Sequence, residues 1–355
     1  FHREFCGLNS TSAVPVSAVP RVETMEFHRR VREAVREGGR ISALFAGPAG
    51  RTASSRELWA VLAFDRDGRL ELLRTLVSGA YPALTPSVPA AHGFEREIWE
   101  QWGIVPEGHP WLKPIRFSPT FREEGAGPRP PVGRTDFFRV EGEEVHEVAV
   151  GPVHAGIIEP GHFRFSCHGE NVFHLEISLG YQHRGVERAL QGGPGPRTLP
   201  LMETLAGDTT VGHALAYARA VEALAGTAVP LRAGRIRAIA LEQERLANHV
   251  GDLGALAADV GYLPTSSYCG RLRGDFLNLT ALLCGSRFGR GLVRPGGTAF
   301  DLDPTRVEEM RGRLDRSMGD AENAVHLLWR TSTVLDRFEH TGILGRETIE
   351  ALGIV

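Results

Sequence analysis

Residues 151–187 read GPVHAGIIEPGHFRFSCHGENVFHLEISLGYQHRGVE, and this stretch decides the interpretation of the chain. Two strand-like segments, 162–167 and 172–179, flank a turn at Gly169, and residues 145–150 add a third such segment. Five of the fourteen histidines lie here, at positions 154, 162, 168, 174 and 183. Since Gly/Pro-rich loops leave imidazoles free to face a cleft, the stretch predicts either a proton-handling loop or ordinary polar loop histidines.

Apolar residues recur at helical spacing downstream of this stretch. The predicted helices span about 201–225, 237–261, 268–290 and 304–338. In the helix from Arg237, one predicted core face is formed by apolar residues three, four or seven positions apart: Ile239, Leu246, Val250, Leu253, Ala257 and Val260. The sequence therefore predicts a short β-rich entry leading into a bundle of long helices.

The region upstream predicts a smaller α+β domain. It combines a helix at 27–37, strands at 41–46 and 58–63, and a second helix near Leu70. Residues 118–136 are rich in Pro and Gly and predict a linker. The fold class is α+β, with these expected parts: a mobile lead-in at 1–23, an α+β domain at 24–117, the linker at 118–136, and the β-entry and helix domain at 137–355, which we expect to be truncated at its C-terminal end.

Composition excludes several classes of protein. A net charge of −3 gives no general basic field, so we expect no nucleic-acid partner. No segment approaches the roughly 18 consecutive apolar residues of a membrane span, which predicts a soluble, cytoplasmic chain. The four cysteines lie far apart without a C-x-x-C spacing, and His154, His162 and His183 follow no familiar ligand spacing. We therefore expect no metal site.

One helix carries a polar stripe. Its five members recur at spacings of three, four, three and seven residues: Glu242, Arg245, His249, Asp252 and Asp259. Such a stripe is usually a solvated face with weak ion pairs, and its functional alternative is a seam that faces a cofactor, a quinone or a partner subunit. The glycine-rich segment 192–196 includes two prolines, which lack the backbone donors of a phosphate loop. Nucleotide binding is therefore not predicted.

Several ordered motifs together resemble one family. They are residues 151–165, 175–177 and 180–187, then Glu242-x-x-Arg245-x-x-Asn248-His249, Asp259-Val260-Gly261, Arg287 and residues 293–297. This set resembles the large subunit of energy-converting nickel-iron hydrogenases, including formate hydrogenlyase, and the related quinone-site subunit of respiratory complex I. Residues 94–97 and 108–110 are similar to the small peripheral-arm subunit of complex I. The resemblance covers the chain from about residue 26 to its end.

The resemblance has a consequence for metal binding. In those hydrogenases two C-x-x-C pairs hold the metal, and the first pair aligns with Ala206 and Thr209. A methyl group and a hydroxyl cannot replace soft thiolates, so a nickel-iron centre is not expected. The quinone-head tyrosine of complex I aligns with Gly207. The second cysteine pair would lie beyond Val355.

The resemblance also implies site residues. Asp259 matches the aspartate that partners a quinone-site histidine, for which His154 and His162 are both candidates. Glu159 aligns with a glutamate that passes protons near the hydrogenase metal, and Arg184 with an arginine beside the terminal iron-sulfur cluster of a neighbouring subunit. We therefore expect Glu159, His154, His162 and Asp259 to act in proton-coupled chemistry, and the candidate cofactor-facing residues are His183, Arg184, His213 and His249.

Three functions follow from the resemblance. The first is a subunit of a membrane-associated, ion-translocating oxidoreductase that passes electrons from iron-sulfur clusters of partner subunits to a quinone-like acceptor. The second is a catalytically silent scaffold in such a complex, and the third a formate hydrogenlyase-type hydrogenase subunit. The implied partners are a small iron-sulfur subunit and membrane antiporter-like subunits, at the cytoplasmic face of the plasma membrane. The chain itself is expected to bind no cofactor except, on the first reading, a quinone-like molecule.

Overall fold

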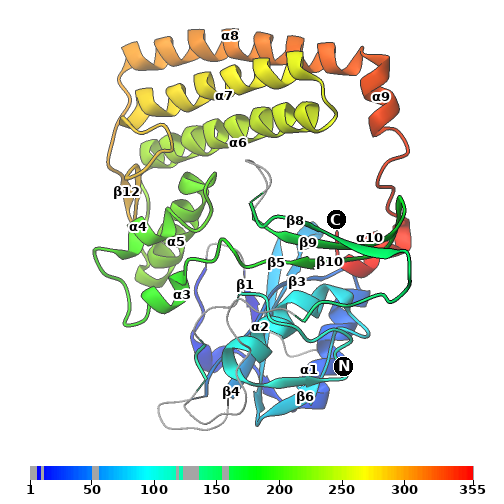
Figure 1. Cartoon of the computed structure of the whole chain (residues 1–355). Helices are drawn as coiled ribbons and strands as arrows, with labels where there is room; N and C mark the ends of the chain where they lie inside the picture. The colour runs from blue at the N-terminus through cyan, green and yellow to red at the C-terminus, as the bar shows by residue number, and fades with distance from the viewer. Residues whose placement is uncertain are drawn as a thin grey trace. The chain divides into compact units, whose positions relative to one another are not determined.

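The computed structural model describes residues 6–8, 12–49, 56–116, 120–122, 136–153 and 160–354. The chain divides into two compact units, each described by itself (Figure 1). The first comprises Phe1–His183 with Leu344–Val355, and the second Arg184–Ile343. Helices and strands both contribute, which confirms the predicted α+β class. Most of the predicted linker, 117–119 and 123–135, lies outside the described residues.

The first unit is built around a sheet in the order β1-β5-β4-β3, with β2 paired in parallel to β5. Its strands are β1 (Cys6–Leu8), β2 (Arg21–Val22), β3 (Arg40–Pro48), β4 (Arg56–Phe64) and β5 (Arg69–Val77). Strands β3, β4 and β5 form an antiparallel meander. Burial along β5 follows the two-residue period of a strand with one face on a core.

Two helices complete the core of this unit. They are α1 (Thr24–Arg36) and α2 (His92–Trp102), joined by short elements η1 (Val16–Ala18), η2 (Asp65–Asp67), η3 (Pro89–Ala91), β6 (Ala80–Pro82), β7 (Val105–Glu107) and α10 (Arg346–Leu352). In α1, Phe27, Val31 and Ala34 are buried at spacings of four and three. This is the spacing of one helix face, and these residues share a core cluster with β3, β4 and β5.

Two expectations for this region were wrong. The lead-in at 1–23 contributes β1 and β2 to the sheet, and Val19 is only 3% exposed. The helix expected near Leu70 is the strand β5. Its leucines, arginines and glutamate favour helices in isolation, but pairing along the whole of β4 overrides that preference.

The second sheet of the first unit is the predicted three-stranded one. Strands β8 (Val145–Val150), β9 (His162–His168) and β10 (Asn171–Ser178) pair antiparallel in the order β10-β9-β8, with the turn at Gly169. Glu176 of β10 is buried and accepts Lys113 Nζ at 2.6 Å and the Phe138 amide at 2.7 Å. These contacts fix the sheet to the segment that follows β7.

The second unit contains three long helices that lie side by side: α6 (Leu231–Asp259), α7 (Leu263–Cys284) and α8 (Pro304–Trp329) (Figure 1). The remaining elements are α3 (Val186–Ala189), α4 (Thr198–Met202), α5 (Thr210–Ala225), β11 (Val293–Arg294), β12 (Gly297–Thr298) and α9 (Ser332–Phe338). The helices predicted at 237–261 and 268–290 exist, although α6 and α7 begin earlier. Among the described helices, none has the length and apolar character of a membrane span.

A chain reversal interrupts the helix predicted at 201–225. Helix α4 ends at Met202 and α5 begins at Thr210, so residues 203–209 form a loop between them. Of the predicted core face of α6, Ile239 is 41% exposed, whereas Val250 and Ala257 are buried. The polar stripe on the same helix is exposed at all five positions, as its spacing indicated.

Two histidines meet in the first unit where α2 begins. The rings of His92 and His109 lie 5.5 Å apart, and His92 also contacts Trp111. His109 Nδ1 accepts the Trp111 amide at 3.1 Å, while His92 Nδ1 and His109 Nε2 are buried without a hydrogen-bond partner among the described residues. Burial, reinforced by the charge of Arg96, lowers the pKa of both imidazoles.

We expect acid to destabilise the first unit through this pair. Because the pKa of each imidazole is lower in the folded state, the unfolded chain binds protons first, and stability falls as the pH drops below about 6.5. Thermal unfolding at pH 7.5 and pH 5 should show this loss, and His92→Gln with His109→Gln should reduce it. His146→Gln, at an exposed position of β8, controls for removal of an imidazole. An unchanged acid response in the double variant would contradict this assignment.

Candidate functional site

The loop at 203–209 is held by hydrogen bonds at its first residue. Glu203 is 7% exposed, and its Oε1 accepts the Gly291 amide at 2.7 Å. Its carbonyl lies 3.4 Å from the Thr210 hydroxyl. The loop therefore enters α5 from a fixed point near the end of α7.

The first turn of α5 is capped by a side chain from another helix. Glu244 of α6 accepts the Val211 amide at 2.6 Å and the Gly212 amide at 3.0 Å. These N–H groups have no partner inside their own helix, so a carboxylate is well suited to them. A Cβ on Gly212 would lie 2.8 Å from Thr209 Cγ2 and 3.3 Å from Glu244 Oε1. Only glycine allows this close approach.

Asp208 ties the same loop to α6 and α7. Its carboxylate accepts Arg273 Nη2 at 2.9 Å, and its carbonyl accepts Asn248 Nδ2 at 3.1 Å. The loop that aligns with the first metal-binding segment of hydrogenases is thus fastened by an ion pair and an amide hydrogen bond.

These contacts surround a pocket with an empty volume of about 270 Å³, part of it open solvent. We call it the α5 pocket. Its polar residues are Asp208, Glu244, Asn248, Arg273 and Arg287, and Val211, Ala247, Leu277, Thr280 and Phe288 complete the lining. Two carboxylates, two guanidinium groups and an amide therefore share one small space beside apolar side chains, a composition typical of ligand-binding sites.

The two carboxylates of the α5 pocket differ in environment. Asp208 is paired with Arg273. Burial raises the pKa of Glu244, the Val211 and Gly212 amides oppose that rise, and the charge of Asp208 adds to it. A carboxyl with a raised pKa in a pocket is a candidate for proton transfer.

A nickel-iron centre does not fit this loop. The aligned ligand positions, Ala206 and Thr209, offer no thiolate. Cys269 and Cys284 are buried in the α7 core, and burial raises the pKa of both thiols. Within the ranges that the structure describes, no group of three or more His, Cys, Asp and Glu side chains is arranged to hold a metal ion.

The predicted site residues of the first unit are only partly described. His154 and Glu159 lie outside the described residues. His162 is half-buried, with Nδ1 3.4 Å from the Gly151 carbonyl and its ring against Phe137. His183 is half-buried, and its amide donates to the Gly180 carbonyl at 3.1 Å.

The predicted residues of the second unit do not form one cluster. Asp259 is the exposed last residue of α6, fifteen positions after Glu244, or about 22 Å along the helix. His249 is exposed on the polar stripe, and His213 is half-buried in the first turn of α5. Arg184 is exposed and its Nη1 lies 3.4 Å from the Leu205 carbonyl. The pairing of Asp259 with His154 or His162 would join the two units and stays a prediction.

Sequence reasoning did not select Glu244 or Arg273. The signal was present, because Glu244 lies between the buried Ala240 and Ala247 on α6, three or four positions from each. A carboxylate at a core-facing position requires hydrogen-bond partners, and here they are two amides of α5.

Comparisons with known proteins agree with this architecture. A family model described as the 30-kDa subunit of respiratory-chain NADH dehydrogenase matches residues 48–131, and one for its 49-kDa subunit matches residues 259–355. Formate hydrogenlyase subunit 5 of Escherichia coli (strain K12) is 28% identical over 356 residues, which cover 95% of this chain and 61% of the relative. Hydrogenase-4 component G of the same strain is 32% identical, over 76% of this chain and 51% of the relative.

Two further matches extend the comparison. An NADH-quinone oxidoreductase subunit of Anaeromyxobacter sp. (strain K) is 30% identical over 64% of this chain and 55% of the relative. A chain of the membrane-bound sulfane sulfur reductase, an archaeal respiratory membrane complex, shares the fold with a TM-score of 0.55. That likeness covers 58% of this chain and 55% of the other at 21% identity.

The fold and the two matched segments define a fused chain with one 30-kDa-like and one 49-kDa-like part. The chain belongs to the family of such fused subunits that includes formate hydrogenlyase subunit 5 and hydrogenase-4 component G, and it is homologous to the matching subunit of NADH-quinone oxidoreductase. It spans about 61% of the first of these relatives and 51% of the second.

Proposed function

We propose that the chain is a subunit of a membrane-associated, ion-translocating oxidoreductase complex. It would receive electrons from iron-sulfur clusters of partner subunits and pass them to a quinone-like acceptor with coupled proton transfer. The observation that carries this proposal is the α5 pocket, where a carboxyl with a raised pKa lies beside Arg273 and Arg287. Relatives named as subunits of NADH-quinone oxidoreductase and formate hydrogenlyase support the class of complex.

The partners and the location belong to the same proposal. A small iron-sulfur subunit would supply the electrons, antiporter-like membrane subunits would move ions, and the chain would lie at the cytoplasmic face of the membrane. The chain would hold no nickel and iron, because Ala206 and Thr209 supply none of the required thiolates. Iron-sulfur clusters would likewise belong to the partners.

Binding of a quinone analogue to the purified complex tests the proposal. Arg287 is an exposed lining residue, and we expect Arg287→Met to weaken binding about tenfold, since a hydrogen bond to a charged group is worth about 1.5–3 kcal/mol. Arg311→Met removes a guanidinium that is 74% exposed on α8 and should leave the affinity unchanged. Asp259→Ala separates the α5 pocket from the exposed stripe of α6. Absence of analogue binding by the wild-type complex would overturn the proposal.

A scaffold without its own chemistry is the second candidate. It is favoured by the contacts of Asp208, which fasten the loop with no ligand involved. A hydrogenase of the formate hydrogenlyase type is the third, and metal analysis finding stoichiometric nickel in the purified complex would favour it. Failure of analogue binding without nickel would leave the scaffold.

A further inference from the structure

Glu244 is bound by neutral donors alone among the interactions that the structure describes. Its two oxygens accept the Val211 and Gly212 amides, and no ion pair of its carboxylate is found within the described residues. The nearest guanidinium of the α5 pocket, on Arg273, is instead bound to Asp208 at 2.9 Å. The cation that would fix Glu244 in its charged form is therefore engaged elsewhere.

The charged groups that line the pocket with Glu244 come from different elements. Asp208 lies on the loop before α5, Arg273 on α7, and Arg287 after the end of α7. Helix α5 itself contributes the amides of its first turn, and His213 follows them in that turn. Asp208 opposes a second negative charge nearby, whereas the amides stabilise one. The two protonation states of Glu244 are thus closer in free energy than for a carboxyl paired with arginine.

Protonation changes what this carboxyl can do. A carboxylate only accepts, and both its oxygens are used by the α5 amides. Addition of one proton converts one oxygen to a hydroxyl, which must donate, while the other oxygen still accepts an amide. Because α5 offers only donors here, the new O–H has to turn toward the α5 pocket.

We infer that Glu244 is the residue that exchanges protons with the molecule bound in the α5 pocket. This inference rests on the proposed function and names the group that serves it. Reduction of a quinone-like acceptor takes two electrons and two protons. The electrons come from the iron-sulfur clusters of partner subunits; Glu244 transfers its proton to one carbonyl oxygen, water supplies the other proton, and water then reprotonates Glu244.

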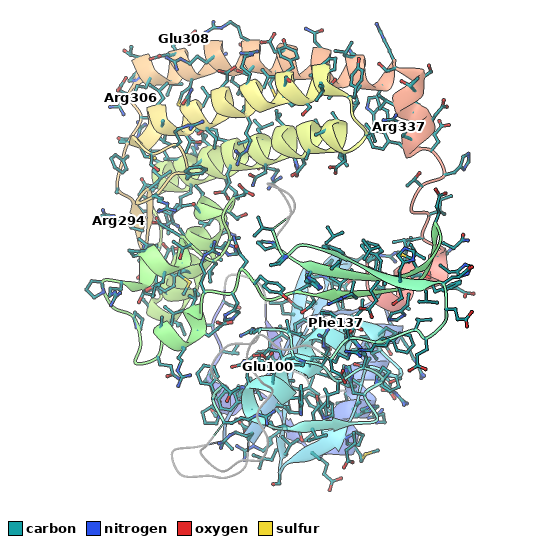
Figure 2. All side chains as sticks on the ribbon, in the orientation of Figure 1. Glu100, Phe137, Arg294, Arg306, Glu308 and Arg337 are labelled. Atoms are coloured by element: carbon teal, nitrogen blue, oxygen red, sulfur yellow. The ribbon has the colours of Figure 1, made fainter. Side chains whose placement is uncertain are left out.

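Infrared spectroscopy of the purified complex tests the exchange directly. A protonated carboxyl has a carbonyl stretch that is absent from a carboxylate, so a pH titration should reveal such a band in the wild type. We expect Glu244→Gln to remove the band and Glu244→Asp to keep a shifted one. Glu308→Gln is the matched control, because Glu308 projects from α8 with 80% of its side chain exposed (Figure 2). A band that persists in Glu244→Gln would overturn the inference.

Quinone reduction by the same variants supplies the second measurement. Loss of a general acid lowers a rate by about 10²–10⁴-fold, and we expect that loss in Glu244→Gln with analogue binding retained. Unchanged rates at every pH in that variant would also overturn the inference. Failure of the proposed function looks different, since the wild-type complex would then bind no analogue while the Glu244 band could still titrate.

Discussion

We expect Arg237→Met to destabilise the second unit by about 3–5 kcal/mol, the cost of leaving one partner of a buried ion pair alone. Arg237 and Glu222 are 4% and 7% exposed, and Arg237 Nη2 lies 2.6 Å from Glu222 Oε1. The arginine also donates to the carbonyls of Arg294 and Gly297, and Glu222 accepts the Gly296 amide at 2.7 Å. Urea unfolding followed by far-ultraviolet circular dichroism measures the change.

A double variant and a control separate the pair from general effects. In Arg237→Met the Glu222 carboxylate stays buried without its cation, whereas Arg237→Met with Glu222→Leu buries no charge and should recover part of the loss. Arg311→Met, which breaks an exposed pair of 3.9 Å, should cost less than about 1 kcal/mol. Equal losses in Arg237→Met and Arg311→Met would show that the buried pair contributes nothing special.

The same pair predicts a response to acid. The hydrogen bond from Arg237 lowers the pKa of Glu222 below that of an unfolded glutamate. Its contribution is therefore present above about pH 4.3 and is lost as the pH falls through the folded-state pKa. This loss occurs at lower pH than the loss expected from His92 and His109, so the two can be told apart in one titration.

The fold of the chain could be predicted largely from periodicity, and its failures have a local cause. The long helices and the β8–β10 sheet were recognisable because each buries one regular face. Strand β5 was not, since its residues prefer helix and only pairing with β4 decides its conformation. The short strand β2 was missed for a similar reason, as two residues carry no period.

The site could be predicted less well than the fold. Motifs pointed to the loop at 203–209 and to α6, and both elements form the α5 pocket. They did not identify Glu244, because the exposed stripe from Glu242 to Asp259 was the more regular pattern on that helix. What decided the site was which carboxyl reaches the amides of α5, and that depends on the close approach that Gly212 permits. Sequence spacing alone does not contain this contact.

We expect Gly180→Ala to be the most damaging single substitution in the first unit, at about 2–5 kcal/mol. Gly180 has a φ of +93°, and an added Cβ would lie 2.1 Å from the Ile115 carbonyl oxygen. That backbone cannot retreat, because Glu100 Oε2 accepts the amides of Ile115 and Arg116, both at 2.9 Å. The substitution should therefore separate the segment after β10 from the one that Glu100 holds (Figure 2).

Gly38→Ala distinguishes the two parts of this cost. Gly38 follows α1 with a φ of +88°, nearly that of Gly180, but no atom lies within 4 Å of an added Cβ. Its substitution should cost only the conformational strain of an alanine at positive φ, about 1–2 kcal/mol. The difference between the two variants in the free energy of unfolding then measures the collision with Ile115. If Gly180→Ala were no worse than Gly38→Ala, the backbone approach at Gly180 would not be needed to hold the β8–β10 sheet in the first unit.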